Sequence, residues 1–337
     1  MKKNTTFLIS GGAGRVITAI PALEKFSRLN PDDDFKVLVH GWDMLYWSHP
    51  ILQEKTFEVG QKGVFDNYIK NYNLVSPEPY HVYGYYNQEK SLAEAFDEII
   101  NQTDDHSDLE KPNLYYSRSE KTTIQSNLEA LKQQTKKEKI IVFQPFGSGA
   151  IIENSAFMDT SGRSMYPEDF RELCRHLSQY ACVVYFGSPD LFQLADCSDY
   201  AFAPPTADLR MYMTLISQCD YFVGCDSVGQ HMARAFDKPG LVLMGSTFEK
   251  NVSYPEYFKF YRNDSVRVKY NPIRIGGLDC QLADRNNDGA MKFDNNQLKE
   301  IFSLIGQNFE KSNGNGKSQT IIKTVPKSPR SKEKKGF

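Results

Sequence analysis

The sequence lacks several features that would assign it to particular classes of protein. No apolar run approaches the ~20 residues that a membrane-spanning helix needs. The N-terminus, Met1 to Phe7, leads into a short apolar segment and has neither the core nor the small-residue cleavage site of a signal peptide. We therefore expect a soluble, cytoplasmic protein.

Cysteine is sparse, with six residues among 337, and no two of them form a C-x-x-C pair. Zinc knuckles and redox motifs of that spacing are therefore unsupported. Cys182 and Cys219 stand in apolar, strand-like contexts. We expect the cysteines to be reduced and to act as small hydrophobic side chains.

The complete glycine motifs that hold common nucleotide cofactors are also missing. Gly12, Ala13 and Gly14 could begin a dinucleotide motif, but Ile17 stands where its third glycine belongs. His40 ends the next apolar segment, where an acidic ribose partner is expected, and no P-loop sequence occurs. We expect no cofactor. The glycine turn either lets a ligand approach the backbone at a helix start or is a tight turn without a ligand.

What the sequence does contain is a regular alternation of apolar runs and helical periodicity. With 40% hydrophobic and 24% charged residues, its composition is that of a globular protein. Runs of this kind are typical of parallel sheets covered by helices. Strands are predicted at 5–10, 35–40, 140–144, 181–186, 221–223 and 241–244. Helices are predicted at 15–29, 91–100, 120–139, 167–180, 208–218, 227–236 and 296–308.

The chain is long enough for two domains. We predict an α/β protein with two Rossmann-like, doubly wound parallel-sheet domains facing a central cleft. Residues 1–130 would form the N-terminal domain and residues 138–310 the C-terminal domain. The stretch 60–113 is rich in Tyr and Asn and weakly periodic, which indicates loops that line a cleft or the surface.

Charge is unevenly distributed along the chain. The net charge is −2, yet residues 311–337 hold eight basic residues and one acidic residue. That segment carries +7, so residues 1–310 carry −9. Because it is also rich in Ser, Gly, Asn and Pro, we predict a disordered basic tail. It either contacts nucleic acid or an anionic membrane surface, or serves solubility alone.

The most informative segment, Cys219 to Ala235, predicts a strand, a turn and a helix. Asp226 and Ser227 stand at the carboxyl end of the predicted strand, where parallel sheets bind ligands. The free N–H groups and partial positive charge of a helix start suit a diphosphate. His231, four residues after Ser227, lies on the same helix face and can donate to a phosphate. Alternatively, Asp226 or Ser227 only caps the helix and His231 is a buried histidine.

This segment resembles the bacterial heptosyltransferase family of GT-B glycosyltransferases. The family pattern is a strand, Asp-Ser-Gly-Pro-x-His, a helix, Lys-Pro, a strand and Gly-Pro-Thr. The matching residues here are 226–231, Lys238-Pro239, 241–244 and Gly245-Ser246-Thr247. Weaker patches at 12–23, 146–149 and Tyr166-Pro167 agree, so the resemblance covers about residues 5–45 and 140–305.

The resemblance implies a GT-B glycosyltransferase that moves a sugar, with inversion, from a nucleoside diphosphate sugar to a hydroxyl of a glycan or lipopolysaccharide-type saccharide. It makes residues 1–130 the acceptor-binding domain and residues 138–310 the nucleotide-sugar-binding domain. No D-x-D motif stands at a suitable strand end, so metal-independent transfer is expected, with Arg163 adding positive charge at the diphosphate. The implied donor-binding residues are Gly147, Ser148, Gly149, Arg163, Asp226, Ser227 and His231. On the acceptor side the resemblance places Gly12, Ala13 and Gly14.

One departure from the family pattern concerns catalysis. Arg15 occupies the position of the family's aspartate, its candidate general base. The acceptor hydroxyl must lose a proton to a base, and arginine stays protonated. Arg15 therefore occupies the family's catalytic position but cannot act as the base there. Asp43, just after the second predicted strand, is our substitute base, or else an ordinary polar loop residue.

Three further interpretations stay open. A DNA-modifying transferase acting on hydroxylated bases would use the basic tail. A catalytically silent nucleotide-sugar or glycan-binding protein would explain Arg15. Finally, 284–289 matches the first half of an EF-hand loop, but Asn295 stands where its glutamate belongs. There a surface turn is favoured over calcium binding.

Overall fold

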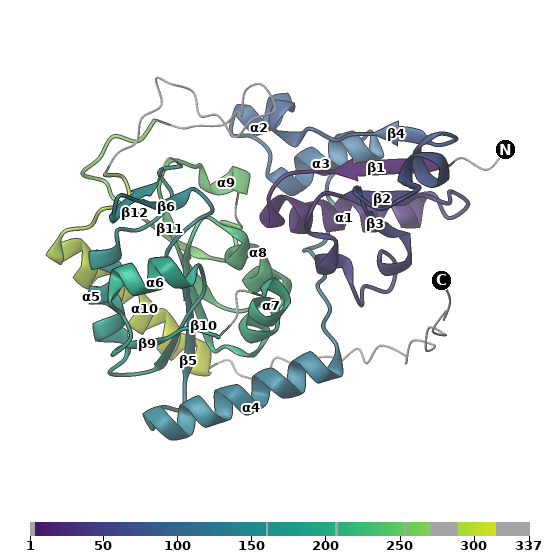
Figure 1. Ribbon diagram of the computed structural model, residues 1–337. Helices are drawn as coiled ribbons and strands as arrows, with labels where there is room; N and C mark the ends of the chain where they lie inside the picture. The colour runs from purple at the N-terminus through teal and green to yellow at the C-terminus, as the bar shows by residue number, and fades with distance from the viewer. Residues whose placement is uncertain (1–3, 160, 206–207, 253, 270–288, 315–337) are drawn as a thin grey trace.

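The computed structural model describes residues 4–159, 161–205, 208–252, 254–269 and 289–314 (Figure 1). It contains one parallel sheet in each half of the chain, and helix α4 (Arg118–Thr135) lies between them in the sequence. The predicted α/β architecture of two Rossmann-like domains is confirmed. The predicted domain boundaries fall at the end of α4 and stay a prediction.

The N-terminal sheet has the strand order β3-β2-β1-β4, with every neighbouring pair parallel. Its strands are β1 (Thr5–Ile9), β2 (Lys36–Val39), β3 (Thr56–Glu58) and β4 (Asn73–Val75). Helix α1 (Ala13–Leu29) follows β1 directly and packs against α3 (Leu92–Asn101). This connection makes β1, α1 and β2 the predicted βαβ unit.

The stretch 60–113 contains more structure than the sequence predicted: the π-helix η3 (Phe65–Ile69), η4 (Pro79–His81) and α2 (Tyr83–Tyr86), besides β4 and α3. Two further short elements, η1 (Asp43–Tyr46) and η2 (Gln53–Lys55), lie between β2 and β3. Helix α3, predicted at 91–100, is confirmed and begins at a capping box. The Ser91 hydroxyl accepts the Glu94 N–H at 3.2 Å, and the Glu94 carboxylate accepts the Ser91 N–H at 2.6 Å.

The C-terminal sheet has the order β12-β11-β10-β5-β8-β9, again parallel throughout. Its strands are β5 (Ile140–Gln144), β8 (Cys182–Tyr185), β9 (Ala201–Phe202), β10 (Tyr221–Cys225), β11 (Gly240–Met244) and β12 (Lys259–Arg262). The helices are α5 (Pro167–Leu177), α6 (Pro189–Ala195), α7 (Leu209–Gln218), α8 (Val228–Ala235), α9 (Glu249–Val252) and α10 (Asn295–Gly314). A separate hairpin pairs β6 (Ala150–Glu153) with β7 (Ala156–Asp159).

Every residue of β5, β8, β10 and β11 is buried. Helices cover both faces of a sheet of this kind, so its central strands are apolar throughout. That is why these strands could be predicted from uninterrupted apolar runs. The five cysteines in the described residues are free and buried, as predicted.

Some predictions fall at or beyond the limits of the description. Helix α10 continues to Gly314, so the first four residues of the predicted tail are helical, which corrects its predicted start. Residues 315–337 and 284–288, which hold the rest of the tail and most of the EF-hand-like match, lie outside the described residues. In the part of the chain that is described, no helix is long and apolar enough to cross a bilayer.

The two domains contact each other directly. Helix α1 of the first domain packs against α8 of the second. Arg210 of α7 is buried, and its guanidinium donates to the carbonyl oxygens of Met44 at 2.8 Å and Tyr115 at 3.2 Å. It also pairs with Glu120 at the start of α4, at 2.8 Å. This one side chain therefore joins α7, η1 and the segment that links the domains.

Candidate functional site

The predicted strand, turn and helix are β10, residues 226–227 and α8. Ser227 is the N-cap residue, but its side chain makes no capping hydrogen bond. The cap comes instead from Gln144, the last residue of the adjacent strand β5. The Gln144 side-chain oxygen Oε1 accepts the Gly229 N–H at 2.8 Å, and its side-chain nitrogen Nε2 donates to the Ser227 hydroxyl at 3.1 Å. One backbone donor of the helix start is thus already satisfied within the protein.

Asp226 is buried between α8 and Arg163. One of its carboxylate oxygens accepts the Gln230 side-chain amide at 2.5 Å. The other oxygen has no hydrogen-bond partner among the described residues and lies 3.8 Å from the Arg163 guanidinium. Arg163 also donates to the Asp226 carbonyl oxygen at 3.4 Å. The structure therefore brings together two residues predicted from separate motifs and places a cation at the carboxyl end of β10.

Asp159 shapes the loop that carries Arg163. Its carboxylate accepts the backbone N–H groups of Ser161 at 2.8 Å, Arg163 at 3.0 Å and Ser164 at 2.6 Å. Burial alone would raise the pKa of Asp159, but the hydrogen bonds from Ser161 and Ser164 hold that pKa below its ordinary value. The carboxylate therefore stays ionised at neutral pH and fixes the loop.

The glycine turn after β5 lies against this loop. The Gly147 N–H donates to the Ser164 hydroxyl at 2.9 Å, while Ser148 is exposed. A Cβ at Gly149 would lie 2.6 Å from a carboxylate oxygen of Asp159. Only glycine leaves room for the Asp159 carboxylate at this position, whether or not the turn binds a ligand.

His231 lies at the interface of the two domains. Its side chain is buried, and Nδ1 lies 3.1 Å from the Tyr254 hydroxyl. A Cβ on Gly14 would lie 2.9 Å from the imidazole, so α1 touches the ring closely. Desolvation lowers the pKa of His231 to about 4, although the Asp226 charge opposes the shift. The ring is therefore neutral at pH 7 and can donate from only one nitrogen.

Three more of the predicted site residues stand at the start of α1. Gly12 is the exposed N-cap of α1, and Ala13 is buried. The buried Arg15 side chain donates to the Pro77 carbonyl oxygen at 2.7 Å and pairs with Glu78 at 3.2 Å. Its guanidinium thereby holds the segment between β4 and η4.

Asp43 lies in the first turn of η1, directly after β2, and is partly exposed. Its carboxylate accepts the Trp47 indole N–H at 3.3 Å. The carboxylate is thus accessible at the end of the loop that follows β2.

A groove of about 380 Å³ opens between the domains. Its walls come from 91–111 of the first domain and from Arg234 and 250–256 of the second. A cavity of about 20 Å³ adjoins His231 and shares Ser91, Ala93 and Tyr254 with the groove. Within the described residues no group of three or more His, Cys, Asp or Glu side chains is placed to hold a metal ion.

A comparison with known protein families matches the middle of the chain. Residues 105–256 match the family model described as glycosyltransferase family 9 (heptosyltransferase). Over these residues the chain is similar to heptosyltransferases. This range contains Gln144, Arg163 and the whole start of α8. The resemblance predicted from the Asp226–His231 motif is therefore confirmed, as is the enzyme class, a glycosyltransferase.

Solved structures share the fold of this heptosyltransferase-like chain. The glycosyl transferase family 9 protein from Veillonella parvula DSM 2008 superposes with a TM-score of 0.59 at 12% identity, over 77% of this chain and 87% of that one. E. coli ADP-heptose lps heptosyltransferase II gives 0.54 at 11%, over 92% and 99%. E. coli heptosyltransferase WaaC, solved with ADP, gives 0.53 at 13%, over 92% and 99%. No curated protein matches the sequence.

The site contains residues that the motifs did not reveal. Gln144, Asp159 and Tyr254 each contact a predicted site residue. Gln144 could have been recognised in the sequence as a site candidate, because it is the polar residue that ends an otherwise apolar strand. Asp159 and Tyr254 had none, because their partners become neighbours only through the folding of loops.

Proposed function

We propose that this chain transfers a sugar from a nucleoside diphosphate sugar to a hydroxyl group of a glycan, with inversion and without a metal ion. The observation that carries the proposal is the start of α8 at the carboxyl end of β10, with Arg163 beside Asp226. A helix start and an adjacent guanidinium both stabilise the negative charge of a diphosphate. The E. coli neighbour solved with ADP supports this ligand class.

In this mechanism the acceptor oxygen attacks the anomeric carbon, and the bond from that carbon to the diphosphate oxygen breaks. Charge develops on the leaving diphosphate, where the α8 dipole and Arg163 stabilise it. The glycine turn at 147–149 would lie beside the diphosphate, and His231 would donate one hydrogen bond as a neutral ring. Because His231 carries no charge at pH 7, Arg163 is the main cationic group that we propose for the donor.

The proton of the acceptor hydroxyl must pass to a base, and we propose Asp43 for that role. Its carboxylate is accessible and follows β2 at the sheet edge where ligands bind in parallel sheets. Replacement Asp43→Asn keeps the size and the acceptor for Trp47 but removes the base. We expect turnover to fall at least about 100-fold with donor binding unchanged. Unchanged turnover would exclude Asp43 as the base.

Donor binding is tested by thermal shift with UDP-, ADP- and GDP-linked sugars and the matching diphosphates. A ligand that binds only the folded chain raises the melting temperature by mass action. We expect a shift with one nucleotide series and its loss in Arg163→Met and His231→Ala. A well-folded chain that shifts with none of these nucleotides would contradict the proposal.

A second candidate is a nucleotide-sugar-binding protein that catalyses no transfer. Arg15, at the family's base position, is engaged with Glu78 and Pro77, and Gln144 already occupies one N–H of the α8 start. Such a protein would show the thermal shift but release no nucleoside diphosphate with any glycan acceptor. Release of diphosphate that depends on an acceptor would exclude this candidate.

A further inference from the structure

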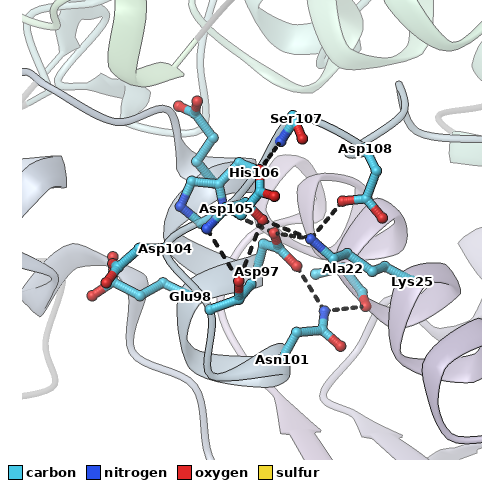
Figure 2. A network of polar contacts seen from close by, with 12 residues as sticks. Ala22, Lys25, Asp97, Glu98, Asn101, Asp104, Asp105, His106, Ser107 and Asp108 are labelled. Carbon is cyan, nitrogen blue, oxygen red and sulfur yellow. Dashed lines mark hydrogen bonds and ion pairs between the residues drawn. The ribbon is translucent and has the colours of Figure 1, made fainter.

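The groove between the domains has a buried polar network behind one wall. His106 lines the groove, and Figure 2 shows its ring directed toward Asp97 through one nitrogen, with the second nitrogen pointing away. The Nδ1 to Asp97 oxygen distance is 2.7 Å. Because the other groups at this carboxylate are donors, Asp97 acts as an acceptor and the imidazole N–H donates to it. The Nδ1 proton is thereby fixed, so that in the neutral ring the lone pair stands on Nε2.

Asp97 itself is held rigidly. It is fully buried, accepts the Asn101 side-chain amide at 2.7 Å, and pairs with the Lys25 ammonium at 3.0 Å. Lys25 also pairs with Asp108 at 2.6 Å and donates to the Asp105 carbonyl oxygen at 2.8 Å. The loop that carries His106 is thus fixed on both sides of the histidine, and the ring orientation with it.

The second nitrogen of His106 has no such partner. The side chain is only 9% exposed, and Nε2 is buried without a hydrogen-bond partner among the described residues. Buried polar atoms in proteins are nearly always hydrogen-bonded, so this exception requires a reason. A carboxylate that orients a histidine whose far nitrogen is unpaired is the arrangement found where that nitrogen meets a ligand.

The groove walls indicate what kind of ligand fits. The groove is lined by the cations Lys111, Arg234 and Lys250 and by the carboxylates Glu94, Glu110 and Glu256, while Tyr254 and Pro255 add apolar surface. Lys111 and Arg234 both pair with Asp237, and the Glu94 carboxylate accepts the Ser91 N–H at the start of α3. An anion would meet as many carboxylates as cations there. A neutral molecule with many hydroxyl groups can donate to the carboxylates, accept from the cations and pack on the tyrosine. The volume of about 380 Å³ falls in the range of small-molecule sites.

We propose that this groove binds a saccharide, with His106 Nε2 accepting a hydrogen bond from a sugar hydroxyl. His106 is a binding residue in this role, and Asp97 and Lys25 are positioning residues. Tyr254 connects the groove to the donor side, because its ring lines the groove and its hydroxyl contacts His231 at 3.1 Å. The inference rests on the proposed function to the extent that the saccharide is the acceptor or part of it.

The test is a titration of the full chain with maltose, lactose and D-mannose, followed by the ¹⁵N resonances of the histidine rings. The free protein should show an unprotonated Nε2 at His106, and this resonance should move when a saccharide binds. His106→Ala should weaken saccharide binding about tenfold, the equivalent of one hydrogen bond to a ligand. His176→Ala, a histidine on α5 outside the groove, is the control and should bind as the unchanged chain does.

A second variant, Lys250→Met, changes an exposed wall residue and should also weaken binding while leaving the melting temperature unchanged. Saccharide affinity that is unaffected by both variants would overturn the proposal, as would binding of inorganic phosphate in the groove in preference to a saccharide. Nucleotides are titrated separately. If nucleotides bind but no saccharide does, the groove proposal alone is wrong; if saccharides bind but no nucleotide does, the proposed transferase function is wrong.

Discussion

At the scale of single residues, His231 shows how burial changes the chemistry of a motif residue. The motif suggests a phosphate donor, and a protonated histidine would be the stronger one. Desolvation lowers its pKa to about 4, so the folded chain holds a neutral ring at physiological pH. In the proposed donor site the positive charge therefore comes from Arg163 and the helix start, and His231 contributes one directed hydrogen bond.

This burial predicts a pH dependence of stability. An unfolded histidine titrates near pH 6.5, so between about pH 6.5 and pH 4 the unfolded chain binds a proton that the folded chain does not. Stability contributed by this group is complete above pH 6.5 and falls as the pH drops toward 4, by up to about 3 kcal/mol. Replacement His231→Gln should remove this part of the slope in urea unfolding measured from pH 7.5 to pH 4.5.

The control for this measurement is His176→Gln, because the His176 side chain is 37% exposed and pairs with Glu172 on the surface. Its replacement should leave the slope nearly unchanged. If His231→Gln keeps the full slope, the ring is hydrated in the folded chain and its assignment as a neutral donor is wrong.

How much of the site could be predicted depends on how far apart the partners lie in the sequence. Asp226, Ser227 and His231 are local, so a motif could reveal them. Gln144 reaches Ser227 across 83 residues, and only the pairing of β5 with β10 makes them neighbours. Tyr254 likewise meets His231 through a loop that has no regular pattern, so no spacing in the sequence could indicate it.

At the scale of elements, the contact between α1 and α8 sets how closely the domains approach. Gly14 lies in the first turn of α1 and faces His231. Replacement Gly14→Ala places a methyl group 2.9 Å from the imidazole, so one helix must move. Overpacking of this kind costs about 1–3 kcal/mol and outweighs the smaller gain in helix propensity. Urea unfolding should show the loss.

Two comparisons isolate this contact. In a His231→Ala background the obstacle is gone, so Gly14→Ala should become nearly neutral, with a coupling free energy of about 1 kcal/mol or more. Gly306, within α10, has open space around its Cβ position. Gly306→Ala should therefore stabilise the chain by about 0.5–1 kcal/mol. Additive effects of Gly14 and His231 replacements would show that the helices do not touch as described.

Elements could be predicted where one physical signal dominates. The central strands β5, β10 and β11 are buried on both faces and appear in the sequence as apolar runs. The edge strand β12 is partly exposed, and β9 has only two residues. Neither strand has an apolar run in the sequence that would distinguish it from a loop. Strand pairing with a neighbour, which no local pattern contains, defines these edge strands.

At the scale of the whole molecule, the basic C-terminal residues allow a test of the DNA alternative. Residues 315–337 contain seven basic residues and one acidic residue. If DNA is the acceptor, full-length protein should bind duplex DNA with an affinity that falls steeply with salt, and deletion of residues 315–337 should reduce that slope. Donor binding, measured by thermal shift, should be unchanged by the deletion. Absence of salt-dependent DNA binding by the full chain would exclude the alternative.

Arg210 is one of the buried side chains that join the two domains. Its guanidinium is buried and contacts Met44, Tyr115 and Glu120. Replacement Arg210→Met removes the donor to three carbonyl oxygens and the partner of the Glu120 carboxylate. This should cost about 3 kcal/mol in urea unfolding. The domains should also separate more readily, so we expect a larger radius of gyration in solution scattering.

The matched control is Arg175→Met, which breaks an ion pair with Glu172 whose side chains are 43% and 39% exposed. A surface pair of this kind contributes about 0–1 kcal/mol, so its loss should change stability little. Arg210→Lys should recover only part of the stability, because an ammonium cannot donate in the fixed fork that reaches η1 and α4 together. If Arg210→Met leaves both stability and the radius of gyration unchanged, Arg210 does not hold the domains together. The other contacts between them must then suffice, including the α1–α8 packing and the hydrogen bonds of Asn251 to the carbonyl oxygens of Tyr85 and Lys90.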